Sequence, residues 1–196
     1  MLSACNFSRE EQIYLKEDFA FMRGLRFSQN SPLHRKVFGS SYLSYLKQDL
    51  KQIVPEGILY QSCHDALICA GGDGVIRVSK RFWRVDLPQV VRASFFIHEM
   101  SHLRGSRHVG CDSEAFSPLH APFSRIAVQG SQECDVDAKG AVGTQIIFLG
   151  NISHFCANCD DATKKSAEDF RKFLMKLILT ENARLILTND LLDPPR

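Results

Sequence analysis

The segment from Gln89 to Arg104 constrains the fold more than any other part of the chain. Its apolar residues surround the helical axis almost completely: Val90, Val91, Phe95, Phe96, Ile97, Met100 and Leu103. A helix that is hydrophobic all round lies at the centre of a domain. Because polar groups are costly to bury in such a place, we expect His98, Glu99 and His102 on this helix to serve a chemical function.

The spacing of these polar residues predicts a metal site. His98 and His102 are four residues apart, so both imidazoles lie on one face of the helix and can bind the same ion. Glu99 is offset from that face, where it can reach a water held by the ion without binding the ion itself. Gly105 lets the chain leave the helix in a conformation closed to other residues, and His108 is placed to return as the third ligand. Three protein ligands leave one position open for water, as in catalytic zinc sites.

The string His98-Glu99-x-x-His102-x-x-Gly105-x-x-His108 resembles the signature of the metzincin zinc peptidases. The resemblance extends over roughly residues 72 to 111. It implies one Zn²⁺ per chain held by the three histidines, Glu99 as the general base, and a peptide or protein substrate. In metzincins an edge strand before the active-site helix binds the extended substrate, and we expect Val75 to Ser79 to be that strand and to recognise a peptide by strand addition.

The sequence departs from the metzincin pattern after the third histidine. Metzincins place a methionine turn beneath the metal, but the only later methionine, Met175, lies in an amphipathic helix and is expected to pack in the core. We therefore expect a minimal bacterial relative that uses the stretch from Gly140 to Gly143 as the floor of its site. If His108 is not a ligand, Asp112 and Glu114 are the substitutes, because zinc also accepts a carboxylate.

Four other polar residues have two interpretations each. His120 and His154 are candidates for binding substrate or stabilising an oxyanion, although isolated histidines are more often surface or hydrogen-bonded core residues. Asp135 and Asp137 are interpreted as helix-cap carboxylates. The alternative is a hydrogen bond from one of them to a metal-ligating histidine.

Seven cysteines suit an oxidising compartment. Cys5 follows Leu2-Ser3-Ala4, which resembles a bacterial lipobox, in which small residues precede a lipidated cysteine. Residues 1–7 are interpreted either as the remnant of an export signal with Cys5 as a lipid anchor, or as an accidental match. Six cysteines then remain for three disulfides: Cys111–Cys134, Cys156–Cys159 and Cys63–Cys69.

The Cys156-x-x-Cys159 pair has two alternatives to a disulfide, which are half of a structural zinc site and a thioredoxin-like redox pair. A zinc ribbon needs a second such pair, and the spacing of Cys63 and Cys69 does not provide one. A redox pair needs a βαβ setting that the sequence does not show. A disulfide is therefore the preferred interpretation, and Cys111–Cys134 would hold the loop that carries His108.

The remaining pattern predicts an α+β fold, a helix-dominated single domain over residues 8–193 with a small sheet or hairpin before the buried helix. Ser8 and Glu11 form a capping box that opens the first helix. The other expected elements are a helix from Tyr42 to Ile53, a strand at Ile58–Tyr60, a hairpin of Ala66–Ala70 with Val75–Val78, and helices starting near Val136 and Asp160. The segment Leu185–Leu187 suits a strand or a helix.

Composition limits the function. The net charge of +2 is small and scattered, which argues against nucleic acid as a partner, and no apolar run is long enough for a transmembrane segment. We expect an exported zinc peptidase that is periplasmic, secreted or an outer-membrane lipoprotein. The alternatives are a zinc amidase acting on cell-wall amides and a non-catalytic envelope protein with structural zinc. A fourth ligand from Asp112, Glu114 or Cys111 would favour structural zinc.

Overall fold

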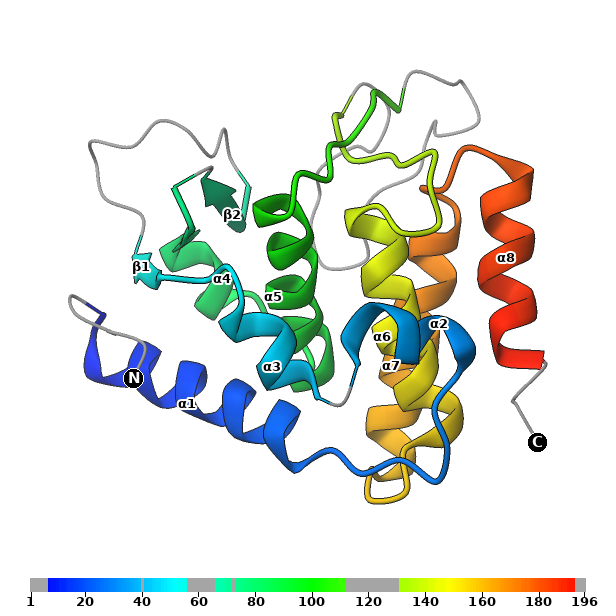
Figure 1. The fold of residues 1–196 in the computed structure, drawn as a ribbon. Coiled ribbons are helices and arrows are strands. Elements are labelled where there is room, and N and C mark those ends of the chain that lie inside the picture. Colours follow the sequence, from blue (N-terminus) through cyan, green and yellow to red (C-terminus); the bar gives the residue numbers. More distant parts are fainter. Residues whose placement is uncertain (1–6, 40, 56–65, 72, 112–130, 193–196) are drawn as a thin grey trace.

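The computed structural model describes residues 7–39, 41–55, 66–71, 73–111 and 131–192 (Figure 1). The fold is helix-dominated with a small mixed sheet before the buried helix, as predicted. Its helices are α1 (Arg9–Gly24), α2 (Pro32–Phe38), α3 (Tyr42–Lys47), α4 (Lys80–Arg84), α5 (Gln89–Leu103), α6 (Ala141–Phe155), α7 (Asp161–Met175) and α8 (Glu181–Leu192). Its strands are β1 (Gln52–Pro55), β2 (Ile68–Gly71) and β3 (Val75–Val78).

Helix α5 occupies the centre of the molecule, which confirms the prediction from its composition. It packs against α6 and α7 on one side and against α1 and β2 on the other. Val91, Phe96, Ile97 and Met100 are fully enclosed. Arg92 of α5 also forms a two-pronged ion pair with a buried aspartate of α1, at nitrogen–oxygen distances of 2.9 and 3.1 Å. The polar residues at the end of α5 therefore belong to a helix that is packed on both sides.

The strand order β1-β3-β2 corrects one expectation about the sheet. The hairpin of β2 and β3 is present and antiparallel, but β1 pairs parallel with the other side of β3. Val75 to Ser79 is therefore not an edge strand, because β3 is hydrogen-bonded on both sides. The edge strand beside α5 is β2.

Two predicted helices have different bounds in the structure. The helix expected from Tyr42 to Ile53 ends at Lys47, and Ile53 lies in β1 instead. Pro55 disfavours a helical conformation of the residue before it, and pairing with β3 supplies the hydrogen bonds that the helix would have made. Helix α6 begins at Ala141 rather than near Val136.

The remaining boundaries agree with the sequence pattern where the structure describes them. Ser8 and Glu11 form the predicted capping box, and Asp160 caps α7. The segment Leu185–Leu187, which was compatible with strand or helix, belongs to α8. The strand expected at Ile58–Tyr60 lies outside the described residues.

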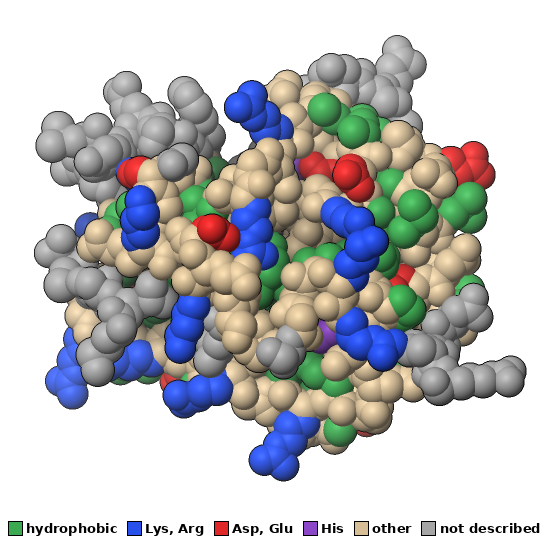
Figure 2. Space-filling model, viewed as in Figure 1, with side chains coloured by type: hydrophobic (Ala, Val, Ile, Leu, Met, Phe, Trp, Pro, Cys, Tyr) green, Lys and Arg blue, Asp and Glu red, His purple; other side chains and the backbone are tan. Residues whose placement is uncertain are grey.

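The molecular surface shows no dense region of positive charge on the face drawn in Figure 2, where lysine and arginine side chains are spread out. This distribution agrees with the small net charge. Exposed large hydrophobic side chains occur mainly on α8, at Leu185, Ile186 and Leu192. Among the described residues, no helix has the length and apolar character needed to cross a membrane.

Candidate metal centre

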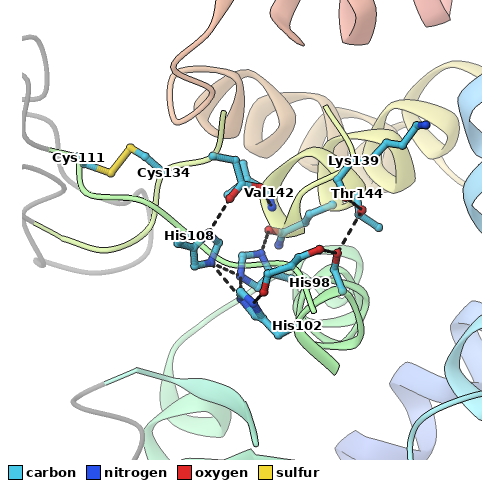
Figure 3. Close-up of polar contacts among 12 residues, drawn as sticks. His98, His102, His108, Cys111, Cys134, Lys139, Val142 and Thr144 are labelled. Carbon is cyan, nitrogen blue, oxygen red and sulfur yellow. Dashed lines mark hydrogen bonds and ion pairs between the residues drawn. A yellow bond between two sulfur atoms is a disulfide. The ribbon is translucent and has the colours of Figure 1, made fainter. Parts of the chain in front are cut away.

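Three imidazoles converge at the end of α5 (Figure 3). The Nε2 atom of His98 lies 3.0 Å from that of His108 and 3.2 Å from that of His102, and the last two are 3.0 Å apart. His98 and His102 lie on successive turns of α5. Gly105 takes a positive φ of 92° just after the helix, as its place in the motif predicts, and the chain then turns so that His108 faces the other two. The three residues form a group that could hold a metal ion.

The outer ring nitrogen of each histidine has its own oxygen partner. The Nδ1 atom of His98 lies 3.0 Å from the Gln145 side-chain oxygen, and that of His102 lies 2.9 Å from the Ser106 carbonyl. The Nδ1 atom of His108 lies 2.8 Å from the Asp135 carboxylate. A carbonyl and a carboxylate oxygen only accept, so each Nδ1 carries the proton and donates it.

The donor and acceptor roles of its partners also fix the orientation of the Gln145 amide. Its nitrogen donates to the Ser94 hydroxyl at 2.8 Å, and that hydroxyl donates to the Val91 carbonyl at 2.7 Å. The Gln145 oxygen therefore faces His98. Ser94 and Gln145 are almost completely buried, so this chain of hydrogen bonds fixes the tautomer of His98 inside the core.

In their neutral form the three rings therefore carry lone pairs on Nε2, and the three Nε2 atoms face one another at about hydrogen-bond distance. Burial lowers the pKa of His98 well below its usual value, and the neighbouring His108 and His102 lower it further, against the opposing effect of Gln145. Burial is also the largest cause of the lowered pKa of His102. Neutral imidazoles arranged in this way present three lone pairs to one point, which is the arrangement that a metal cation requires.

Asp135 connects the third histidine to the rest of the fold. One of its carboxylate oxygens accepts from His108, and the other accepts from the Val142 amide at 2.8 Å. Its backbone is hydrogen-bonded to Leu177 and Leu179, in the segment after α7. A side chain on Gly140 would collide with this carboxylate, since a Cβ atom there would lie 2.2 Å from it. The stretch Gly140–Gly143 thus supports the site through Asp135.

We predict that Asp135→Asn weakens metal affinity by about 10- to 100-fold, the usual cost of losing an outer-shell partner of a ligand histidine. The neutral amide lowers the basicity of His108 and no longer fixes its orientation. Competition with a chromophoric chelator measures the affinity, and thermal unfolding shows whether the fold is kept. Asp137→Asn is the matched control, because Asp137 is exposed and its carboxylate accepts only from the Lys139 amide among the described residues. Equal affinity in both variants would contradict this role of Asp135.

Glu99 is buried on α5 directly after His98, with 5% of its surface exposed. Burial raises its pKa well above the usual value, and the charge of Glu133 raises it further. The Ala70 amide of β2 donates to this carboxyl and opposes the shift. The edge strand and the buried carboxyl are therefore in direct contact beside the three histidines.

Two of the predicted disulfides are present in the structure. Cys111 and Cys134 are joined at a Cα separation of 5.4 Å, and Cys156 is joined to Cys159. The first bond joins the segment that carries His108 to the segment that carries Asp135, and Figure 3 shows it beyond His108, away from the other two histidines. Cys69 is also disulfide-bonded, and its predicted partner Cys63 lies outside the described residues.

Among the described residues, several candidates do not contribute to this group. His154 lies near the far end of α6, where it contacts Ser153 and Gly150. Asp137 stabilises the turn before α6. Met175 ends α7, where it packs against the hydrophobic core. Asp112, Glu114, His120 and Cys5 lie outside the described residues.

Gln145 and Ser94 were not among the predicted site residues. A signal was present, because Gln145 lies within an apolar stretch of α6 just as His98 lies within α5. A buried polar side chain needs a partner, and this one should have been assigned to the site.

Comparisons of the chain with models of known protein families, with curated proteins and with solved structures find no match. The interpretation of the site therefore depends on its geometry and on the motif.

Proposed function

We propose that this protein is a zinc-dependent peptidase in which His98, His102 and His108 hold one zinc ion and Glu99 is the general base. The observation that carries the proposal is the set of three Nε2 atoms facing one another beside a buried carboxyl. Imidazole is a common zinc ligand. A tetrahedral site with zinc–nitrogen distances of 2.0–2.1 Å separates its nitrogens by about 3.3–3.4 Å, close to the separations found here.

The reaction requires a base beside the ion and an acid for the leaving group. Bound zinc would supply an activated water at neutral pH and would polarise the scissile carbonyl. Glu99 accepts the proton of the attacking water and later delivers it to the departing amine. Its raised pKa suits both steps, because a carboxyl whose pKa is shifted towards neutral pH can take up the proton of the water and then release it to the departing amine.

We further propose that the substrate lies along β2 in an extended conformation. The expected substrate strand was β3, but β2 is the strand at the edge of the sheet and contacts Glu99 through Ala70. An extended peptide can add to such an edge by backbone hydrogen bonds. A peptide bound along β2 would have one of its peptide bonds next to the three histidines.

A structural role for zinc receives less support from the ligand set. Structural sites use four protein ligands, and Cys111, a candidate for the fourth, is bound to Cys134. Among the described residues the group contains only the three histidines. A structural site also gives no reason to bury Glu99 next to a ligand.

We propose that the protein is exported and works in the periplasm, at the cell surface or outside the cell. Disulfides are typical of proteins from oxidising compartments, and the structure contains Cys111–Cys134 and Cys156–Cys159. Cys5 remains a proposed lipid anchor.

The test is hydrolysis by purified protein of a mixed peptide library and of cell-wall amides. The proposal expects cleavage of peptides, loss of cleavage after chelation, and recovery with one equivalent of zinc per chain. Cleavage of cell-wall amides alone would assign the site to a zinc amidase. Stoichiometric zinc without cleavage of any amide would favour a non-catalytic zinc protein.

A further inference from the structure

Two of the three proposed ligands are positioned by α5 itself. His98 and His102 both lie within that helix, which is packed on both sides. The chain stays tied to the end of α5 as far as Ser106, whose amide donates to the Ser101 carbonyl at 3.1 Å and whose hydroxyl lies 2.8 Å from that of Ser101. The positions of these two ligands therefore do not depend on the segment that carries His108.

The third histidine is positioned by pairing between two segments. Among the described residues, the backbone of residues 107–111 makes hydrogen bonds only with residues 131–134. Val109 and Cys134 exchange two of these bonds, at 2.7 and 3.2 Å, and the Cys111 amide donates a third at 2.8 Å. A single pair of short strands is marginally stable in water, so these bonds alone do not hold the third ligand firmly.

The second of these segments is attached to the rest of the fold through Asp135. That residue is almost completely buried. Its backbone bonds with Leu177 and Leu179 at 3.0 and 2.8 Å, and its carboxylate accepts from the Val142 amide at 2.8 Å. The segment that carries Asp135 is therefore the fixed support, and the segment that carries His108 is the part that has to be held against it.

The Cys111–Cys134 disulfide is the covalent connection between the two segments. Cys111 is three residues after His108, and Cys134 is directly before Asp135. The bond, the short stretches of backbone and the contact of His108 with Asp135 at 2.8 Å thus form one closed ring. Without the bond, 23 positions of chain separate the two cysteines, and closing a loop of that length costs conformational entropy. The disulfide therefore holds the third ligand in its binding position before a metal arrives.

We propose that metal binding and the Cys111–Cys134 disulfide are coupled, so that the site reaches full metal affinity only after this bond has formed. In the reduced chain the metal must also order the segment that carries His108, which makes the free energy of binding less favourable. Coupling of this kind is reciprocal, so bound metal also makes the bond harder to reduce. The inference rests on the metal of the proposed function but not on peptidase activity.

The redox step is a two-electron thiol–disulfide exchange. Two glutathione thiols give up two electrons and two protons, the S–S bond of the protein breaks into two cysteine thiols, and the glutathione becomes a disulfide. In an oxidising compartment the reverse reaction with a disulfide oxidant forms the bond. Cys111 and Cys134 are both 0% exposed, so exchange requires the two segments to separate. A chain newly made in a reducing compartment thus has a weak metal site, which export completes.

Zinc affinity, measured by competition with a chromophoric chelator, tests the coupling without any substrate. Cys111→Ala combined with Cys134→Ala should bind zinc about 10- to 100-fold more weakly than the oxidised wild type, the range for losing a partner that orients a ligand histidine. Alanine is used because free thiols bind zinc themselves. The matched control is Cys156→Ala combined with Cys159→Ala, which removes the disulfide at the far end of α6 and should keep wild-type affinity.

A double-mutant cycle shows whether the disulfide acts through His108. In a His108→Ala background, removal of the Cys111–Cys134 bond should cause no further loss of zinc affinity, because the third ligand is already absent. A disulfide that only stabilised the fold would lower the affinity by the same factor in both backgrounds. That result overturns the proposal, as does equal affinity of the wild type and the variant without this bond.

Reduction of the wild type is a second measurement, which decides the question even where the alanine variant does not fold. Glutathione redox buffers with and without excess zinc are followed by alkylation, and mass spectrometry reports the reduced fraction of Cys111 and Cys134. Zinc should raise the ratio of squared glutathione to glutathione disulfide at half reduction by the same factor as the loss of affinity. The Cys156–Cys159 bond should show no shift. Identical reduction of Cys111–Cys134 with and without zinc overturns the proposal.

The outcomes separate this inference from the proposed function. Coupling in a protein that cleaves no amide overturns the peptidase and leaves this inference intact. Cleavage by a protein that shows no coupling has the opposite meaning. Failure of the oxidised wild type to bind zinc overturns both.

Discussion

Glu99→Gln is expected to lose hydrolysis by at least about 10²- to 10⁴-fold while keeping one zinc per chain. The size follows from the usual contribution of a general base, and a group that also acts as the acid contributes more. Glutamine has nearly the same shape as glutamate and can still accept from the Ala70 amide. It cannot take a proton from water. The measurements are kcat/KM on the best library substrate and zinc content, with Glu10→Gln, at an exposed glutamate of α1, as the control.

The same variant should be more stable than the wild type in the metal-free protein at neutral pH. The pKa of Glu99 in the folded state lies well above its ordinary value of 4.5, so the folded state binds its proton more tightly than the unfolded chain. The wild type therefore loses stability as pH rises from 4.5 towards the folded pKa, whereas the neutral glutamine has no such loss. Thermal unfolding of both proteins across this pH range measures the difference. Equal turnover in wild type and variant would remove Glu99 from the mechanism.

His108→Ala is expected to weaken zinc binding by more than about 100-fold, beyond the 10- to 100-fold typical of an outer-shell partner. The substitution removes one of three ligands and leaves the buried Asp135 carboxylate without its imidazole partner. Competition titration with a chromophoric chelator gives the affinity, and circular dichroism checks that the helices are kept.

The control for this variant is His154→Ala, since His154 lies near the far end of α6 and should not affect zinc. If His108→Ala keeps full affinity while Glu114→Ala loses it, the third ligand is a carboxylate. The metzincin-like assignment would then be wrong.

The sequence predicted the centre of this fold because helix periodicity and burial are local properties. The apolar residues of α5 required a central position, and the spacing of His98 and His102 placed both rings on one face. Gly105 marked the end of the helix, because its positive φ is open mainly to glycine. The disulfide Cys111–Cys134 was predicted because Cys111 lies shortly after His108 in the sequence, where a crosslink would hold the third ligand.

The errors occurred where pairing between distant segments decided the structure. Ile53 was assigned to a helix on its local pattern, but β3 supplied a partner and made it part of β1. That extra strand moved β3 to the middle of the sheet and left β2 at the edge. Strand order depends on contacts that no local pattern records.

The sequence alone thus determined that His98, Glu99, His102 and His108 could form one site, since their spacing along a helix and a tight turn fixes their relative positions. Only the tertiary structure decided what surrounds them. Gln145 and Asp135 are 47 and 27 residues from the histidines that they orient, and β2 reaches Glu99 through a separate hairpin. The physical reason is that a helix sets its own hydrogen bonds locally, whereas the partners of buried side chains are chosen by the packing of the whole chain.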